Sequence, residues 1–108
     1  MRVNRPPNCP LETALGLIAG KWKGVILFHL MDDKKRFGEL RQFMPSVTQR
    51  MMTKQLRELE SDGLIHREVY NVVPPKVEYS LTEKAQALKP IMVALEQWGK
   101  TFNGQAVD

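Results

Sequence analysis

Residues 46–63, SVTQRMMTKQLRELESDG, contain the strongest indication of the fold. On a helical wheel stepped at about 100° per residue, the apolar residues Met52, Leu56 and Leu59 fall on one side. Apolar residues at this spacing are typical of a helix that faces a hydrophobic core. The pattern therefore predicts an amphipathic helix over residues 46–62.

Both ends of this helix carry recognisable signals. Pro45 ends the segment before it, and Ser46 and Gln49 have the S-x-x-Q spacing of a capping box. Gly63 follows the last helical residue, where glycine readily adopts the conformation that ends a helix. We therefore expect the helix to start at Ser46 and to stop before Gly63.

The side of this helix opposite the apolar residues is polar and mostly basic. It carries Arg50, Thr53, Lys54 and Arg57, and the N-terminal end of the helix carries Ser46, Thr48 and Gln49. A DNA recognition helix needs this composition, because its first turns enter the major groove, where such side chains reach base edges and phosphates. The acidic residues Glu58, Glu60 and Asp62 lie only in the second half, which favours an N-terminus that approaches phosphates. A solvated helix face is the alternative.

The periodicity of the flanking sequence predicts the remaining elements. In chain order they are an extended arm at residues 1–8, helices at 9–19, 22–31 and 36–44, the helix at 46–62, strands at 64–70 and 76–81, and a last helix at 83–103. Thr82 suits the N-cap of the last helix, and Pro90 kinks or splits that helix. The expected fold is a single winged helix-turn-helix domain over residues 1–108. It is mainly α with a small β-hairpin (α+β), and residues 64–81 form the wing.

The first and last helices carry surplus apolar surface. Their apolar positions are Leu11, Leu15 and Ile18 in the first helix, and Leu88, Ile91, Met92, Leu95, Trp98 and Phe102 in the last. Burial between two protomers would cover both stripes, so we expect helices 9–19 and 83–103 to form a homodimer interface. A dimer would present two recognition helices about 34 Å apart to a pseudo-palindromic site on double-stranded DNA. The alternative is that both ends fold back onto their own core.

The basic charge of the chain is concentrated in one segment. Residues 34–57 contain seven Lys or Arg residues and one Glu, a net charge of +6, whereas the rest of the chain has nine basic and eleven acidic residues, a net charge of −2. This asymmetry indicates an anionic partner, with nucleic acid as the first candidate. Outside the central helix, the candidate phosphate contacts are Lys34, Lys35, Arg36 and Arg41, and the candidate wing contacts are Arg67 and Lys76.

Length and composition exclude several classes of protein. The chain has 108 residues, enough for one domain, and no apolar run approaches the roughly 20 residues that span a bilayer. The start of the chain does not read as a secretory signal, and one cysteine cannot form an internal disulfide, so we expect a cytoplasmic protein. We expect neither a metal nor a cofactor, because metal-ligand spacings and a Gly-rich phosphate loop are missing. A small cysteine-dependent reductase or hydrolase is the enzyme alternative.

Cys9 lies directly before Pro10, at the expected start of the first helix. A helix N-terminus makes a thiol more reactive. Cys9 is therefore a candidate sensor of oxidants or electrophiles, and the alternative is an unreactive small residue beside a helix cap.

Several short motifs together resemble a known family. They are CPLE (9–12), GKW (20–22), RFGELR (36–41), LRELESDGLI (56–65) and PPKVEYSLT (74–82). In their order and spacing, residues 9–99 resemble the HxlR-type branch of the MarR-like winged-helix transcriptional regulators of bacteria and archaea. One departure is Ala85, where the family usually has Gly.

The resemblance implies a homodimeric DNA-binding regulator with a recognition helix at 46–62, a wing at 64–81 and terminal helices at the dimer interface. It also implies a sensor role for Cys9, because several members sense oxidants, quinones or aldehydes with a cysteine at this position. A disulfide would then join Cys9 to Cys9 of a second protomer or to a small thiol, and alkylation is the other route.

The sequence thus predicts a dimeric, sequence-specific DNA-binding transcriptional regulator, a repressor rather than an activator. A winged helix that contacts only proteins is the alternative. Nothing in the sequence identifies a small-molecule effector.

Overall fold

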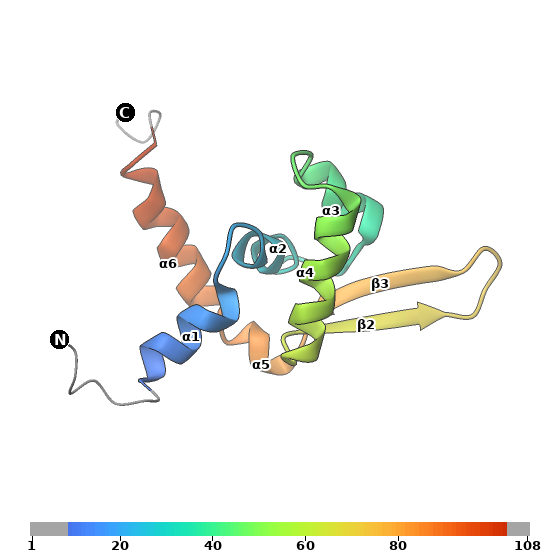
Figure 1. Cartoon of the computed structure of the whole chain (residues 1–108), viewed down its shortest axis with the longest axis horizontal. Helices are drawn as coiled ribbons and strands as arrows, with labels where there is room; N and C mark the ends of the chain where they lie inside the picture. The colour runs from blue at the N-terminus through green and yellow to red at the C-terminus, as the bar shows by residue number, and fades with distance from the viewer. Residues whose placement is uncertain (1–8, 104–108) are drawn as a thin grey trace.

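The computed structural model describes residues 9–103, so the predicted arm at residues 1–8 lies outside the described residues. The elements are α1 (Pro10–Ile18), α2 (Lys23–His29), β1 (Lys35–Arg36), α3 (Phe37–Phe43), α4 (Gln49–Ser61), β2 (Ile65–Tyr70), β3 (Lys76–Leu81), α5 (Glu83–Gln86) and α6 (Lys89–Lys100). In Figure 1 the β2–β3 hairpin projects away from the helices on one side, and α1 and α6 lie on the other side. The predicted class, mainly helical with a small antiparallel sheet, is confirmed.

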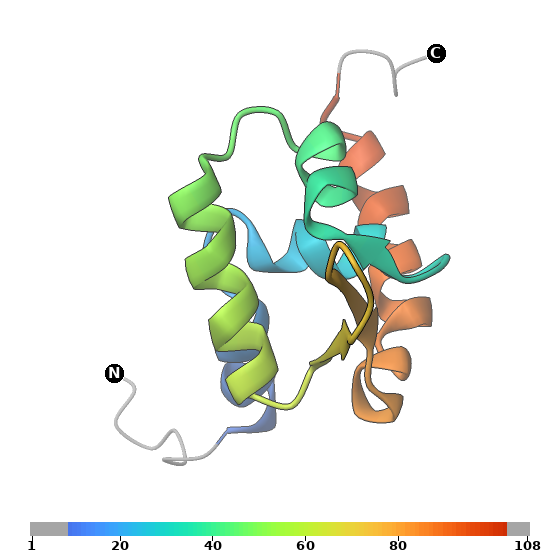
Figure 2. The same ribbon diagram turned by 90° about the vertical axis from the view of Figure 1, so that its right-hand side faces the viewer.

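The hydrophobic core lies where α2, α3 and α4 meet the base of the sheet. Its buried residues are Ile26, Leu27, Leu30, Leu40, Met44, Val47, Met52, Leu56, Leu59, Leu64, Ile65, Tyr79, Ala85 and Met92. Figure 2 looks toward the hairpin tip and shows α4 along one side of the molecule, with α2 between α4 and α6. The three residues that α4 contributes, Met52, Leu56 and Leu59, are those that its periodicity predicts.

The predicted start of α4 is wrong by three residues. The helix begins at Gln49, and the hydroxyl of Thr48, rather than that of Ser46, accepts a hydrogen bond from the Met51 N–H at 3.0 Å. Val47 is buried, and its N–H donates to the carbonyl of Met44 at 3.1 Å. Burial of Val47 keeps the preceding residues in a turn, so the helix starts only after it.

The C-terminal end of α4 agrees with the prediction. Gly63 has a φ of 76°, in the left-handed region that favours glycine. Its N–H donates to the carbonyl of Glu60, and the Leu64 N–H donates to the carbonyl of Leu59, both at 3.0 Å. These two bonds form a Schellman motif, which turns the chain directly from α4 into β2.

The last predicted helix is split in two, as Pro90 indicates. The Thr82 hydroxyl accepts a hydrogen bond from the Ala85 N–H at 3.2 Å and so caps α5. The helix stops at Gln86, and α6 starts at Lys89 with Pro90 in its first turn, where a missing N–H costs nothing. Ala85 is completely buried, so the methyl group that distinguishes it from the usual Gly fills part of the core.

The sheet has one strand more than the predicted hairpin. Its order is β1-β3-β2, all antiparallel, and β1 pairs Lys35 with Tyr79 and Arg36 with Glu78. Arg36 was expected inside the third helix, but it lies in β1, and its N–H donates to Glu39 Oε1 at 2.7 Å. A two-residue strand is too short to show a period of two in the sequence, so β1 can be recognised only from its pairing with β3.

Candidate nucleic-acid interface

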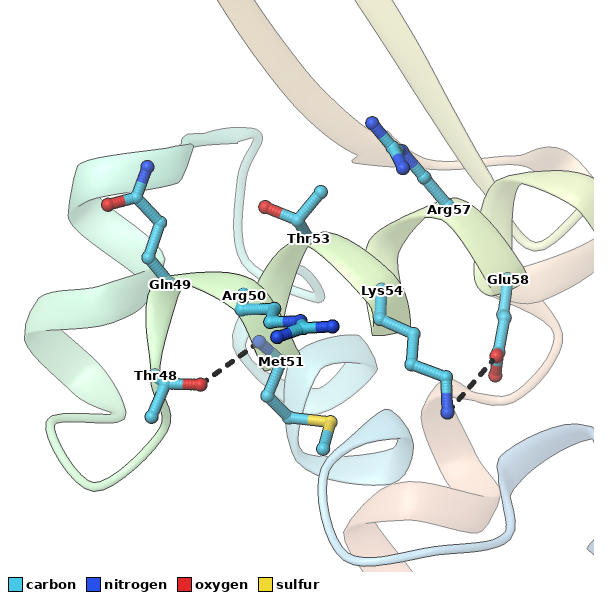
Figure 3. A pocket seen from close by; sticks show the side chains of 8 residues that line it. All are labelled: Thr48, Gln49, Arg50, Met51, Thr53, Lys54, Arg57 and Glu58. Carbon is cyan, nitrogen blue, oxygen red and sulfur yellow. Dashed lines mark hydrogen bonds and ion pairs between the residues drawn. The ribbon is translucent and has the colours of Figure 1, made fainter.

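The exposed side of α4 presents two rows of polar side chains (Figure 3). Gln49, Thr53 and Arg57 project on one side of the helix, and Arg50 and Lys54 project on the other. All are exposed except Thr53, which is half-buried. The open hollow along this face has a volume of about 820 Å³ and is lined by Thr48, Gln49, Arg50, Met51, Thr53, Lys54, Arg57 and Glu58. The structure therefore brings together all the α4 residues predicted to contact DNA, while Ser46 lies in the turn before the helix.

The positive charge of this face is largely unneutralised. The one carboxylate in the hollow, Glu58, lies 2.8 Å from the ammonium of Lys23 on α2 and 3.9 Å from that of Lys54. The hydrogen bond from Lys23 lowers the pKa of Glu58. Within residues 9–103, neither Arg50 nor Arg57 forms an ion pair. Lys23, which no sequence motif singles out, thus makes the shorter contact with Glu58 and leaves Lys54 the longer one.

Arg41 was expected to contact a phosphate, but its side chain is engaged within the chain. It is half-buried, and its Nη2 donates a hydrogen bond to the carbonyl of Val47 at 3.0 Å. This bond ties α3 to the turn before α4, so Arg41 supports the start of the helix. Arg36, by contrast, has an exposed side chain at the start of α3.

Lys34 and Lys35 are also engaged within the chain. The ammonium of Lys34 lies 3.3 Å from a carboxylate oxygen of Glu78 on β3. The ammonium of Lys35 donates to the carbonyl of Asp33 at 3.4 Å and lies 5.9 Å from the ring centre of Phe43. Local sequence gave no signal for these contacts, since both the sheet pairing and the packing of α3 are needed to create them.

The wing contributes one basic residue beside α4 and one farther out. Arg67 of β2 lines a second hollow of about 320 Å³, which it shares with Thr53 and Arg57. Glu60 also lines this hollow, so Arg67 lies near a carboxylate as well as near the guanidinium of Arg57. The ammonium of Lys76 lies 4.5 Å from the ring centre of Tyr70, at the outer end of the hairpin.

Most of the apolar side chains of the terminal helices α1 and α6 are exposed to solvent. In α1 no residue is buried, and in α6 only Met92 is. The large exposed side chains are Leu11, Leu15, Ile91, Val93, Leu95, Trp98 and Phe102. Three of the predicted interface residues behave otherwise, because Ile18 and Leu88 pack partly, and Met92 fully, against the chain's own core. The predicted stripes are thus divided between the core and an uncovered surface.

The side chains of Cys9 and His29 lie in different surroundings. Cys9 is half-buried at the N-cap position of α1, and its thiol is free. His29 stacks on Phe43 with ring centres 4.9 Å apart. Burial, followed by the charge of Lys35, lowers the pKa of His29.

In the part of the chain that the structure describes, no three His, Cys, Asp or Glu residues are grouped to hold a metal, and no helix is long and apolar enough to cross a membrane.

Comparisons with known proteins agree with this arrangement. Residues 17–107 match the family described as HxlR-like helix-turn-helix. The HTH-type transcriptional regulator YdeP of Bacillus subtilis (strain 168) is 60% identical over 95 residues, which cover 88% of this chain and 74% of YdeP.

Two solved structures show the same fold. The redox regulator HypR in its oxidized form is 58% identical, with a TM-score of 0.82, over 86% of this chain and 96% of HypR. The reduced form of the transcriptional regulator YodB from B. subtilis is 37% identical, with a TM-score of 0.77, over 90% of this chain and 96% of YodB. YdeP and YodB are described as transcriptional regulators and HypR as a redox regulator, so the enzyme alternative is set aside. The chain belongs to the HxlR-like helix-turn-helix family and is a transcriptional regulator of the helix-turn-helix type.

Proposed function

We propose that this regulator is a homodimer that binds a pseudo-palindromic operator and represses transcription. The observation that carries the proposal is the exposed face of α4, on which Arg50 and Arg57 have no ion-pair partner among the described residues. Unpaired guanidinium groups on one helix face favour an anionic partner. This face includes the exposed first turn of α4, and the first turns of a recognition helix are the part that enters the major groove of DNA.

The roles of individual residues follow from their positions along α4. Gln49, Arg50 and Thr53 lie in the first turns, so we assign them to base edges in the major groove. Lys54 and Arg57 lie farther from the N-terminus of α4, and we assign them to phosphates on either side of the groove. Ser46 and Thr48, at the turn into the helix, would contact a phosphate near the N-terminal amides.

Contacts from outside α4 come from Arg36 at the start of α3 and from Arg67 in the wing. Both side chains are exposed, and Arg67 shares a hollow with Arg57 of α4. We assign both to backbone phosphates, which adds affinity rather than base discrimination. We assign Lys35 and Lys76 to further phosphate contacts outside the face of α4.

The dimer is assigned to α1 and α6. Trp98 is 64% exposed and Phe102 is 72% exposed, although their rings form an edge-to-face pair with centres 5.1 Å apart. Aromatic side chains exposed together mark a protein interface more often than a solvated surface. Because both helices lie on the side away from the hairpin (Figure 1), a second copy there leaves both α4 helices free for DNA.

The sensor is assigned to Cys9. The half-buried thiol lies at the start of α1, beside the surface proposed to meet the second protomer. A related protein of 58% identity is described as a redox regulator, which supports the same chemistry here. In our proposal two thiols, one from each protomer, lose two electrons and two protons to an oxidant such as a peroxide and form a disulfide, which alters the spacing of the two α4 helices.

The experiment is fluorescence anisotropy with the DNA upstream of the regulator's own gene and with a random duplex, each at several salt concentrations. We expect tighter binding to the upstream DNA and a steep fall of affinity with salt, because phosphate contacts release counterions. An in vitro transcription assay on the same DNA then distinguishes repression from activation. No binding to either duplex at any salt concentration would contradict the proposal and favour a winged helix that contacts only proteins.

The dimer and the sensor need separate tests. Sedimentation equilibrium should show a dimer that Trp98→Ala weakens, with Arg50→Ala on α4 as a control, and a monomer at all concentrations would contradict the interface. An oxidant should change operator binding by the wild type but not by Cys9→Ser, which must bind normally when reduced. An equal response of both proteins would remove Cys9 from the proposal.

A further inference from the structure

The polar face of the sheet contains an unfavourable pair of carboxylates. Glu78 of β3 lies directly opposite Glu68 of β2 and, on its other side, opposite Arg36 of β1. Residues paired in this way share one face of the sheet, and the neighbouring Tyr79 is buried on the other face. Like charges directly opposite each other destabilise a strand pair, so Glu78 needs a compensating partner.

Lys34 provides that compensation. The ammonium of Lys34 lies 3.3 Å from Glu78 Oε1, and the Glu78 side chain is only 15% exposed, against 52% for Lys34. Interaction with the Tyr70 side chain, followed by that with Lys34, lowers the pKa of Glu78. The Glu78 carboxylate in turn raises the pKa of both Lys34 and Tyr70. The charge of Lys34 is therefore already used in the free protein.

This cluster joins two parts of the fold that the backbone connects only weakly. Lys34 immediately precedes β1, which has two residues and leads directly into α3. Glu78 is the third residue of β3, the strand that follows the wing tip at residues 71–75. Only two pairs of residues link β1 to the hairpin, so the ion pair between Lys34 and Glu78 adds a side-chain contact to that link.

We infer that the Lys34–Glu78 pair positions the wing relative to α3 and α4, and that Lys34 does not contact DNA. The inference rests on the proposed function for its consequence, since a fixed wing matters only if the wing meets DNA. It reassigns Lys34, which the sequence presented as a phosphate contact, to a positioning residue. Moving Lys34 to a phosphate would leave the two opposed carboxylates with less compensation.

Binding assays with Lys34→Met, Glu78→Gln and the double variant test the inference. Lys34 is half exposed, and ion pairs open to solvent on one side contribute modestly, so we expect each single change to weaken operator binding about two- to fivefold. The double variant should bind the operator at least as tightly as the single variant with the lower affinity. The slope of affinity against salt should stay at its wild-type value. Glu68→Gln is the matched control, because it removes the same charge from the same face without breaking the contact with Lys34.

The alternative, in which Lys34 binds a phosphate, predicts opposite results. Lys34→Met would then lower the salt slope by about one, and Glu78→Gln would tighten binding at least as much as Glu68→Gln, because it would release Lys34. That pair of results would overturn the inference. The charge-reversed double variant Lys34→Glu with Glu78→Lys adds a second criterion, because it should restore the affinity only if the two residues act through each other.

Amide hydrogen exchange without DNA separates this inference from the proposed function. Exchange at residues 70–76 should be faster in Lys34→Met and Glu78→Gln than in the wild type and in Glu68→Gln. If the wild type binds no duplex, the proposed function fails, but faster exchange still supports a positioning role for the cluster. Unchanged exchange in both variants would overturn it.

Discussion

Helices α4 and α6 are alike in length and pattern but differ in which side the chain covers. They have 13 and 12 residues, and both are amphipathic. The apolar side of α4 is buried through Met52, Leu56 and Leu59, and its basic side is exposed. In α6 only Met92 is buried, while Leu95 and Trp98 remain exposed. The chain thus completes the packing of α4 and leaves its polar side for a partner, whereas it leaves the apolar side of α6 uncovered.

The difference follows from the position of each helix in the fold. Helix α4 lies against α2 and β2, whose apolar faces cover its own (Figure 2). Helix α6 extends away from the core (Figure 1), and its contact with α2 brings the Met92 side chain near Gly24. An amphipathic pattern therefore indicates that one side will be buried, but not whether the same chain or a second copy buries it.

The same substitution in the two helices gives the largest expected effect. Leu59 is fully buried, so Leu59→Ala should lower the free energy of unfolding by about 2–5 kcal/mol. Leu95 is 45% exposed, so Leu95→Ala should cost less. Its effect should depend on protein concentration, because dimerisation stabilises by mass action. Urea unfolding at several protein concentrations measures both, and equal, concentration-independent losses would remove the contrast between the helices.

On the exposed side of α4, the expected effect is on DNA rather than on stability. Arg50→Ala should weaken binding to the operator by about 1–3 kcal/mol if Arg50 reads a base. It should leave the free energy of unfolding nearly unchanged. Lys84→Ala on α5 removes the same charge away from this face and serves as the control. The assignment of Arg50 fails if affinity for operator and random duplex is the same as in the wild type.

The first turn of α4 allows a smaller and sharper test. Thr48→Ala removes the hydroxyl that accepts the Met51 N–H and should cost about 1 kcal/mol of unfolding free energy. Ser46→Ala, two residues earlier, should leave stability nearly unchanged. Thermal or urea unfolding of the two variants decides between the two caps, and a larger loss for Ser46→Ala would restore the cap expected from the sequence.

The smallest expected effect concerns pH. Because burial lowers the pKa of His29 in the folded state, the unfolded chain binds a proton more readily there. Stability from this group is therefore present above the unfolded value of about 6.5 and is lost as the pH falls below it. Unfolding of the wild type and of His29→Gln across this range should show a steeper loss on acidification for the wild type. Parallel curves would mean that His29 does not contribute.

Local features of the sequence were sufficient for much of the fold. The spacing of Met52, Leu56 and Leu59, the glycine at position 63 and the N-cap Thr82 each act within a few residues, so the sequence predicts them correctly. The basic side of α4 follows from the same periodicity, because the position of the core fixes the opposite face. Most of the candidate recognition surface can therefore be predicted from the sequence.

Contacts between distant residues were decided only by the tertiary structure. The pairing of Lys34 with Glu78 needs the register of β1 with β3, and a two-residue strand has no pattern of its own. The bond from Arg41 to the Val47 carbonyl needs the turn that buries Val47, which also moves the cap from Ser46 to Thr48. Which residues are basic, and which helix face carries them, follows from the order of residues along the chain. Which of those charges remain without a partner depends on the folded structure, because packing brings the neutralising residues together.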